Sequence, residues 1–137
     1  LHDALPIFMI GMNDCSEGND ISLTEFTDNL DKLVDQLRQI DALPVLQTTC
    51  PILAGQAPDR EPHIGAHMTA IRQAAQTHGL PLIDHTEFWR QHPDKLDYWM
   101  SNAFHPNEYG HRAFAHLLYR EFGIFDDNSP VCRLFFP

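Results

Sequence analysis

The stretch IFMIGMND, residues 7–14, decides the fold class that the sequence predicts. It opens with four apolar residues in a row, a pattern typical of a parallel β-strand that is buried on both faces. Gly11 ends this run, and the polar residues after it indicate a turn at the carboxyl end of the strand. The pattern favours an α/β protein, and the remainder of the chain tests that interpretation.

A long amphipathic helix is expected after this turn. Ser22 and Glu25 form a capping-box pattern, in which the Ser22 hydroxyl accepts a hydrogen bond from the amide of Glu25. Apolar residues then recur at steps of three and four, which predicts one apolar face along the helix. The members of this face are Phe26, Leu30, Leu33, Val34, Leu37 and Ile40.

A second strand is expected over residues 43–49 and a third over residues 80–84. Between them, residues 64–75 carry apolar side chains at helical spacing. Gly79 follows this helix and suits the left-handed position that closes a helix. Each connection between strands is long enough for a right-handed crossover, so the strands are predicted to form a parallel sheet.

The last third of the chain is predicted to be mainly helical. We expect a short helical turn over residues 86–91, a loop over residues 93–101 and a final helix over residues 108–122. Asn107 is the expected N-cap of that helix, and Gly123 is its expected stop. The order strand–helix, three times over, is the order of an α/β fold.

The composition excludes several classes of partner. The 137 residues include nine Lys and Arg against nineteen Asp and Glu, a net charge of −10 at pH 7. Proteins that bind nucleic acid need clustered basic residues, so we expect no nucleic-acid partner. No apolar run approaches the roughly 18–20 residues that span a membrane, so no membrane span is expected. Three cysteines are too few for a disulfide scaffold.

Polar side chains follow each predicted strand at its carboxyl end, where ligands bind in open α/β sheets. They are Asn13 after the first strand, Thr48 and Thr49 after the second, and Asp84 and His85 after the third. The loop that precedes the final helix is expected at the same edge. The sequence therefore predicts a ligand site there.

His105 and Asn13 are the side chains best suited to chemistry. His105 lies on a loop just before a helix and is followed by proline, and histidine exchanges protons readily near neutral pH, as a general base must. The Asn13 amide can donate hydrogen bonds to a developing oxyanion without bearing charge. The alternative is that Asn13 belongs to an ordinary turn and that His105 only begins a helix.

The two motifs together resemble those of the SGNH hydrolases. IGMND, residues 10–14, is similar to the third sequence block of that family, and HPNEYGH, residues 105–111, is similar to the fifth. The resemblance implies a three-layer, flavodoxin-like α/β fold and ester hydrolysis through an acyl-serine intermediate, without metal or organic cofactor. It also implies that Asn13 donates to the oxyanion, that Gly11 and Asp14 support its turn, and that His105 deprotonates the nucleophile.

The chain departs from the family pattern at the residue that orients the histidine. The family places an aspartate three residues before it, whereas this chain has Asn102. An amide cannot supply the negative charge that stabilises an imidazolium, so the departure weakens the prediction. The Asn102 oxygen, a carboxylate such as Asp94 or Asp97, or a backbone carbonyl remain candidates to orient His105.

A second departure concerns the nucleophile. The family's Gly-Asp-Ser block does not occur, and the serines at positions 16, 22, 101 and 129 are not expected to replace it. The resemblance thus implies a domain truncated at its N-terminus over residues 8–125, and a fragment that is inactive alone. Residues 1–7 are expected to be a non-native leader, and residues 126–137 a C-terminal tail.

The sequence leaves the ligand and some alternatives open. The expected partner is a small-molecule ester, either an acylated carbohydrate, which is favoured, or a lipid. A non-catalytic binding module on the same scaffold is one alternative, and a phosphate-binding α/β enzyme is another. The histidines at positions 63, 67, 111 and 116 are interpreted as solvated helix residues rather than metal ligands. Core packing is favoured over a pocket for the aromatic residues Trp89, Tyr98 and Trp99.

Overall fold

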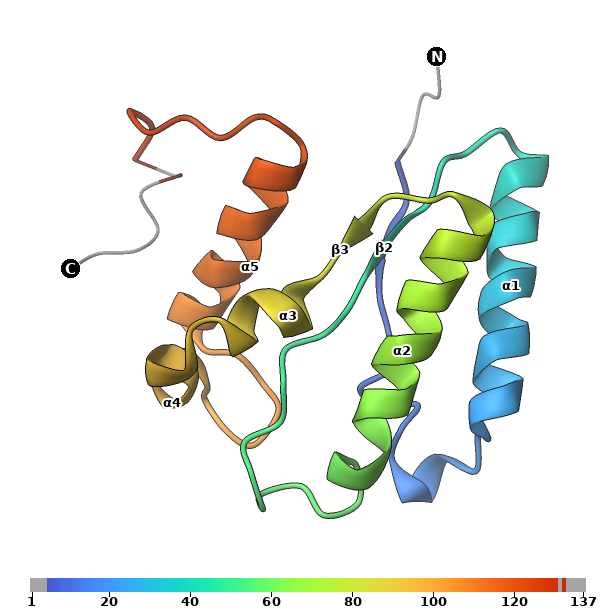
Figure 1. Ribbon diagram of the computed structural model, residues 1–137, viewed down its shortest axis with the longest axis horizontal. Helices are drawn as coiled ribbons and strands as arrows, with labels where there is room; N and C mark the ends of the chain where they lie inside the picture. Colours follow the sequence, from blue (N-terminus) through green and yellow to red (C-terminus); the bar gives the residue numbers. More distant parts are fainter. Residues whose placement is uncertain (1–4, 131, 133–137) are drawn as a thin grey trace. The chain divides into compact units, whose positions relative to one another are not determined.

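A computed structural model describes residues 5–130 and Cys132 (Figure 1). Within it the chain forms two compact units. Unit 1 runs as far as Thr49 and resumes over Pro58–Asp84, and unit 2 consists of Cys50–Ala57 and the residues from His85 onward. The predicted ends of the domain stay a prediction, because residues 1–4, 131 and 133–137 lie outside the described residues.

Unit 1 contains a parallel sheet of three strands in the order β1-β2-β3. The strands are β1 (Ile7–Met9), β2 (Val45–Gln47) and β3 (Leu82–Ile83). All three were predicted from apolar runs, and each is shorter than its run. The prediction of an α/β fold with a parallel sheet is confirmed.

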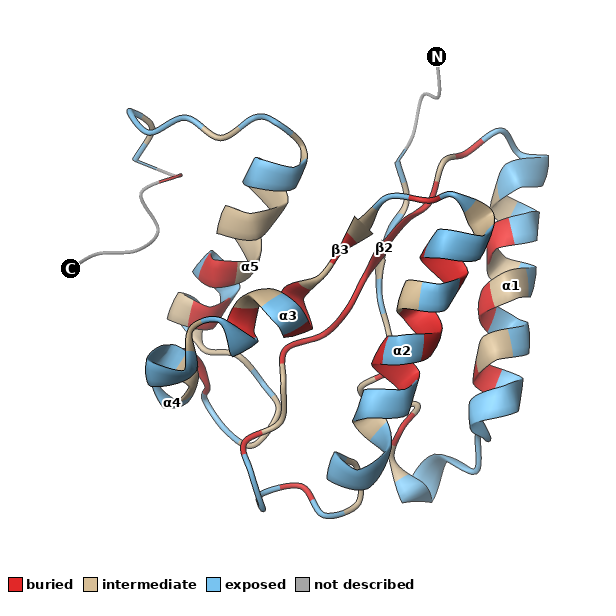
Figure 2. Cartoon of the chain, in the orientation of Figure 1, coloured by how far each residue is buried: buried red, intermediate tan, exposed pale blue. Residues whose placement is uncertain are grey.

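Helices α1 (Leu23–Gln39) and α2 (Glu61–His78) cover one face of this sheet (Figure 1). Phe8, Leu46 and Leu82 are register partners across the three strands, and all three pack into the same core cluster as the two helices. Figure 2 shows the buried residues of each helix on one side and exposed residues on the other. The apolar stripes of the helices therefore form the core of unit 1.

The first helix begins where the sequence predicts, because the Ser22 hydroxyl accepts a hydrogen bond of 3.1 Å from the amide of Glu25. The prediction that Ile40 belongs to the apolar face of this helix is wrong. The helix stops at Gln39, and Ile40 lies beyond it with 73% of its surface exposed, because the last residue of the predicted stripe no longer follows the helical turn. The buried members of the stripe are Phe26, Leu30 and Val34.

The second helix closes at Gly79, which takes the expected left-handed conformation with φ of 62°. His67 corrects another prediction, since it is buried rather than solvated, with 4% of its surface exposed. It lies one turn before Ile71 on the side of α2 that faces α1, and its ring packs 4.8 Å from the ring of Phe26. The buried face of α2 is therefore broader than the apolar spacing alone indicates.

The described part of unit 2 contains three short helical elements and one longer helix. These are α3 (His85–Arg90), the 3₁₀ helix η2 (Pro93–Lys95), α4 (Leu96–Trp99) and α5 (Glu108–Glu121) as the longest. The predicted loop over residues 93–101 is therefore mostly helical. Its proline did not prevent this, because it occupies the first position of η2, where a missing N–H costs nothing.

Aromatic side chains form much of the interior of unit 2. Trp89 and Trp99 are buried, with their ring centroids 5.1 Å apart, and Phe114 of α5 packs 5.2 Å from Trp89. The interpretation as core residues is confirmed for the two tryptophans. It is wrong for Tyr98, which is 55% exposed and stacks on Tyr109.

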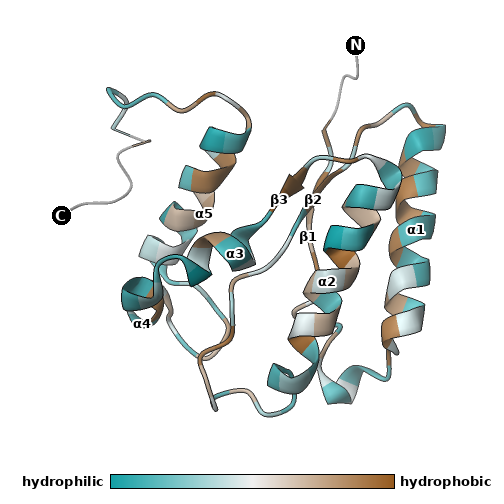
Figure 3. Cartoon of the chain, viewed as in Figure 1, coloured by the Kyte–Doolittle hydropathy of each residue, from teal (hydrophilic) through white to brown (hydrophobic). Residues whose placement is uncertain are grey.

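In unit 1, hydrophobic residues lie in the interior and hydrophilic residues lie on the outer sides of the helices (Figure 3). Figure 3 shows hydrophobic residues along the strands of unit 1 and hydrophilic residues on the outer sides of α1 and α2. Among the described residues, no helix combines the length and the apolar character that crossing a membrane would require.

Candidate active site

The turn that follows β1 is built on Gly11. Its φ of 104° favours glycine, and a Cβ at this position would lie 2.8 Å from the terminal carbon of Met68. The Gly11 amide donates to Asp14 Oδ2 at 2.9 Å, and the amide of Cys15 donates to the Gly11 carbonyl at 3.1 Å. Gly11 and Asp14, which the sequence singled out as supports, thus close this turn together.

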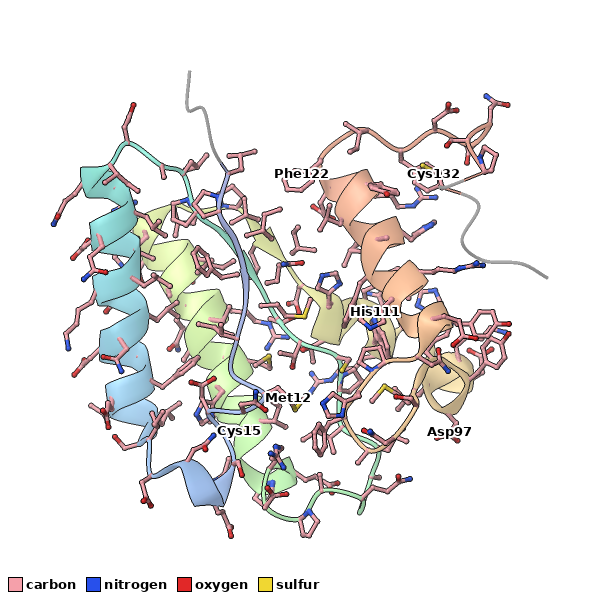
Figure 4. All side chains as sticks on the ribbon, turned by 180° about the vertical axis from the view of Figure 1, so that it is seen from behind. Met12, Cys15, Asp97, His111, Phe122 and Cys132 are labelled. Atoms are coloured by element: carbon pink, nitrogen blue, oxygen red, sulfur yellow. The ribbon has the colours of Figure 1, made fainter. Side chains whose placement is uncertain are left out.

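Asn13 lies at the exposed tip of the turn, and its neighbours hold the backbone on both sides. The Met12 carbonyl accepts hydrogen bonds from Cys15 Sγ and from Arg60 Nε, each at 3.2 Å. The Asn13 carbonyl accepts from the amide of Ser16 at 3.1 Å. Figure 4 shows Met12 and Cys15 side by side at the end of β1. The backbone is fixed while the Asn13 side chain faces solvent.

Asp59 and Arg60, just before α2, are part of this site and were missed from the sequence. Asp59 Oδ2 accepts from Ser16 Oγ at 2.8 Å and from Arg60 Nη1 at 2.6 Å. The hydrogen bond from Ser16, together with the Arg60 guanidinium, lowers the pKa of Asp59. An Asp-Arg pair before a helix was visible in the sequence, but its distant partners in the turn were not.

The polar residues predicted after β2 and β3 are not exposed, and several of them hydrogen-bond within the fold. Thr48 is fully buried, and its hydroxyl donates to Asp84 Oδ1 at 2.8 Å. Arg72 of α2 donates to both oxygens of Asp84, at 2.7 and 2.9 Å. Thr49 and His85 are also buried, so Asn13 alone among these five predicted residues is exposed.

In unit 2, Asn102 contacts the ring of His105. Its Oδ1 accepts hydrogen bonds from the backbone amides of Phe104, at 3.2 Å, and of His105, at 3.0 Å. Because backbone amides only donate, this atom must be the amide oxygen. His105 Nδ1 lies 3.0 Å from the same oxygen and therefore carries the hydrogen. In the neutral ring, Nε2 is then the nitrogen with a free lone pair.

This contact favours the Asn102 oxygen among the candidates for orienting His105. The Asn102 oxygen occupies the Nδ1 side of the ring, whereas the Asp94 carboxylate pairs with Lys95 at 3.3 Å. His105 itself is exposed, and its ring lies 4.6 Å from the ring of Phe104. The group in contact with the Nδ1 side of the ring is thus an amide, which carries no negative charge.

The backbone of the His105 loop is held by a short antiparallel bridge. Met100 and Pro106 pair in this bridge. The amide of Ser101 donates to the His105 carbonyl at 2.8 Å, and Ser101 Oγ donates to the same carbonyl at 3.0 Å. The Ser101 hydroxyl therefore faces the backbone of His105 rather than its ring nitrogens.

Asn107 joins this loop to the start of α5. Its Oδ1 accepts from the amides of Tyr109 and Gly110, at 2.9 and 3.1 Å, as the predicted N-cap. Its Nδ2 donates to the carbonyls of Tyr98, at 2.7 Å, and Met100, at 3.2 Å, which the sequence did not indicate. One side chain therefore fixes both the helix end and the chain that carries His105.

The two halves of the predicted site lie in different units. Asn13 belongs to unit 1, and His105 with Asn102 belongs to unit 2. Their meeting at one edge of the sheet stays a prediction. In unit 1 an open cavity of about 400 Å³ lies beside the Asn13 turn, with Asp14, Cys15 and His67 among its lining residues.

No group of three or more potential metal ligands occurs among the residues that the structure describes. His63 and Glu17 come within 3.4 Å of each other, but they are an exposed pair on the rim of unit 1. His111 is exposed on α5, and His116 is half-buried, with a pKa lowered by burial. The histidines outside the His105 loop thus offer isolated contacts rather than a ligand set.

The described chain thus combines a parallel α/β sheet, a Gly-x-Asn-Asp turn after its first described strand and a histidine just before its last helix. The sequence pattern of the GDSL-like Lipase/Acylhydrolase family matches residues 2–113. The chain belongs to this family. The resemblance drawn from residues 10–14 and 105–111 is therefore confirmed.

Solved structures share the fold at low sequence identity. A lipase/acylhydrolase from Enterococcus faecalis matches 85% of this chain at 22% identity, with a TM-score of 0.75. An alpha/beta hydrolase enzyme from the metagenome of Lake Arreo, Spain, matches 90% at 20% identity, with a TM-score of 0.76. A catalytic mutant of an acetylxylan esterase from Geobacillus stearothermophilus matches 87% at 19% identity, with a TM-score of 0.74.

The chain spans about 60% of these solved structures, covering 59%, 61% and 59% of them in turn. Catalytic mutants of the Geobacillus esterase replace a serine, an aspartate or a histidine, and that aspartate precedes the histidine by three positions. No curated protein matches the chain.

Proposed function

We propose that the protein hydrolyses carboxylic esters through an acyl-serine intermediate. Membership of the GDSL-like lipase/acylhydrolase family supports ester hydrolysis as the reaction class. The observation that carries the finer proposal is the contact between Asn102 Oδ1 and His105 Nδ1, at 3.0 Å. It leaves Nε2 of an exposed histidine as the proton acceptor, which is the state that a general base needs.

His105 is the general base in this proposal. Its Nε2 takes the proton of a serine hydroxyl as the serine oxygen attacks the acyl carbon, and then returns that proton to the departing alcohol. In the second half of the reaction, Nε2 takes a proton from water as the water oxygen attacks the acyl carbon, and then gives that proton to the serine oxygen as the ester bond breaks and the acid is released. Asn102 orients the ring, in the position that an aspartate occupies in the Geobacillus esterase.

Asn13 is the proposed donor to the oxyanion. Its side chain is exposed at the tip of a turn whose backbone is fixed at the Met12 and Asn13 carbonyls. A donor on a rigid backbone stabilises developing charge without reorganising during the reaction. Gly11 and Asp14 support this turn through the hydrogen bond between them.

The nucleophile in this proposal is a serine outside residues 1–137. Within the chain, Ser16 donates to the carboxylate of Asp59, Ser22 caps α1, and Ser101 donates to the carbonyl of His105. None of these contacts joins a serine hydroxyl to an imidazole nitrogen, which is the arrangement that activates a serine. Residues 1–137 alone are therefore expected to be inactive.

An acylated carbohydrate is the favoured substrate class, with a lipid ester as the alternative. The preference comes from the sequence, which has no long apolar stretch to form a surface for a lipid chain. One of the structures that shares the fold is described as an acetyl-xylooligosaccharide esterase. A non-catalytic binding module on the same scaffold is the second candidate function, and Asn102 in place of an aspartate favours it.

The test uses the protein encoded by the whole open reading frame around residues 1–137. Hydrolysis of a short acyl-nitrophenyl ester and of acetylated xylo-oligosaccharide is measured for the wild type, for His105→Ala and for His111→Ala. His111 is the matched control, because it is an exposed histidine on the adjacent helix. Only the His105 substitution should abolish turnover, by a factor on the order of 10³ or more.

A folded whole-frame protein that binds the acetylated sugar without hydrolysing it would support the binding module instead. Equal loss in both histidine variants would point to general damage of unit 2 and count against His105 as the base. Turnover by residues 1–137 alone, abolished by His105→Ala, would overturn the expectation of an external nucleophile.

A further inference from the structure

Arg60 reaches from the start of α2 to the turn that carries Asn13. Its Nε donates to the Met12 carbonyl at 3.2 Å, and its Nη1 donates to Asp59 Oδ2 at 2.6 Å. The Arg60 side chain is 19% exposed, whereas that of Asp59 is 41% exposed. One guanidinium thus holds the carbonyl of the residue immediately before Asn13 and a neighbouring carboxylate.

Asp59 completes the attachment on the other side of the turn. Its carboxylate accepts from Ser16 Oγ at 2.8 Å, and its carbonyl accepts from the amide of Glu17 at 3.0 Å. The turn is therefore bonded to Asp59 and Arg60 both before and after Asn13. The hydrogen bond from Ser16 and the charge of Arg60 lower the pKa of Asp59, so the pair persists to a lower pH than an isolated aspartate would allow.

The side chain of Asn13 depends on this backbone support. It is exposed, and its amide makes no hydrogen bond to any described residue that would fix its direction. The Met12 carbonyl and the Asn13 amide nitrogen share one rigid peptide plane. A group that holds the Met12 carbonyl therefore sets the orientation from which the Asn13 side chain projects.

We propose that Arg60 is a positioning residue for Asn13, which it orients by holding the Met12 carbonyl and the Asp59 carboxylate at the same time. The inference rests on the proposed function, in which Asn13 donates to the oxyanion. A planar guanidinium suits this task because its donors diverge in a fixed fork, whereas a lysine ammonium is a single point. Arg60→Lys should therefore keep one contact and serve only in part.

The first measurement is amide hydrogen exchange on the protein of the whole open reading frame. Arg60→Met should speed exchange at the amides of Cys15 and Ser16, which bond within the turn. Arg38→Met is the matched control. Arg38 also donates to a backbone carbonyl in unit 1, that of His78, but at the far end of α2. The control should leave exchange in the turn unchanged.

The second measurement is esterase kinetics in a double-mutant cycle with Asn13→Ala. We expect Arg60→Met to lower kcat on the order of tenfold, with KM within about twofold, since a misplaced donor costs less than the roughly 10²- to 10³-fold of a missing one. Arg60→Lys should recover part of the loss. In the Asn13→Ala background, Arg60→Met should cost almost nothing further, because the group through which it acts is gone.

The outcomes separate this inference from the function on which it rests. Asn13→Ala with unchanged kcat would overturn the proposed oxyanion donor and the role of Arg60 with it. If Asn13→Ala lowers kcat but Arg60→Met costs the same in both backgrounds, Arg60 is only a structural residue and the inference fails alone. Unchanged exchange at Cys15 and Ser16 in Arg60→Met would overturn it as well.

Discussion

Asn102 Oδ1 lies 3.0 Å from Nδ1 of His105 and also accepts the His105 backbone amide. In the proposed mechanism, this neutral oxygen takes the orienting role that a carboxylate has in serine triads. The ring already has the tautomer required of a general base, with the hydrogen on Nδ1. What the contact lacks is the negative charge that stabilises the imidazolium formed during the reaction.

Asn102→Asp should therefore raise the esterase activity of the protein encoded by the whole reading frame. In serine proteases the reverse substitution lowers kcat about 10⁴-fold, partly through a wrong tautomer. Here the imidazole already has its hydrogen on Nδ1, so the substitution adds only the negative charge beside the ring. We expect an increase of at least about tenfold in kcat. Initial rates on a short acyl-nitrophenyl ester at saturating substrate would measure it.

The control for this gain is Asn29→Asp, which adds the same charge at an exposed position on α1. It should leave kcat unchanged. A rate that falls in Asn102→Asp, with folding intact, would show that the loop is adapted to an uncharged partner and would favour the non-catalytic alternative.

The thiol of Cys50 should make the protein less stable at alkaline pH. Burial raises the pKa of Cys50 from 9.0 to about 12. The folded state thus keeps the proton over a range of pH in which the unfolded state releases it. Stability is fully present below pH 9 and is lost as the pH rises towards 12, by roughly 1.4 kcal/mol at pH 10.

Denaturant titrations at pH 8 and pH 10 would measure this loss. Cys50→Ala should be less stable at pH 8, because it leaves a small cavity, but should lose less of its stability between the two pH values. Cys15, whose pKa burial raises to about 11, acts in the same direction and remains in both proteins. Equal losses in wild type and variant would contradict the prediction.

The free side of β1 should promote self-association of residues 1–137. In the described sheet β1 pairs only with β2, and Leu5, Ile7 and Met9 are exposed along it. An apolar strand with an unpaired edge is a template for pairing with another chain. Ile7→Lys should reduce the association seen by light scattering.

Ile40→Lys is the control that distinguishes strand-edge pairing from nonspecific hydrophobic association. Ile40 is more exposed than Ile7, at 73% against 40%, but it lies after α1 and not on a strand. If strand pairing drives association, this control should have little effect. A monomeric chain with a cooperative thermal transition would contradict the prediction altogether.

The sequence predicted the elements whose evidence is local. The cap at Ser22, the glycine stop at Gly79 and the N-cap at Asn107 depend on neighbouring residues, and all three are present. His67 and Ile40 were misjudged, because burial depends on what a helix packs against and on the residue at which it ends. The two short helices over residues 93–99 were missed because neither is long enough to show a periodic pattern.

The candidate site divides in the same way. The motifs at Asn13 and His105 are short and contiguous, so their chemistry could be predicted and the family confirmed. For the group that orients His105, the sequence offered several candidates, and only the hydrogen-bond geometry favours Asn102 among them. The contact of Arg60 with the turn could not be predicted from the sequence, because its acceptor is the backbone carbonyl of Met12 and every residue has such a carbonyl.

Gly110, in the first turn of α5 beside the His105 loop, should not tolerate a larger residue. A Cβ there would lie 2.3 Å from the Trp99 carbonyl oxygen and 2.7 Å from Pro106 Cβ, and the oxygen belongs to backbone that cannot rotate away. Gly110→Ala must therefore displace the start of α5 or the bridge beside His105, at a cost of about 3 kcal/mol in the free energy of unfolding.

Gly65→Ala is the matched control for this substitution. Gly65 also lies within a helix, but a Cβ there would meet nothing within 4 Å, so the change should stabilise the protein by roughly 0.5–1 kcal/mol through helix propensity. Denaturant unfolding of both variants measures the difference in the free energy of unfolding. We also expect kcat to fall only in Gly110→Ala, because only that change moves the Asn107 contacts that hold the loop. The prediction would be contradicted if Gly110→Ala were as stable and as active as Gly65→Ala. In that case α5 and the His105 loop would move independently, and the close packing at Gly110 would not position the histidine.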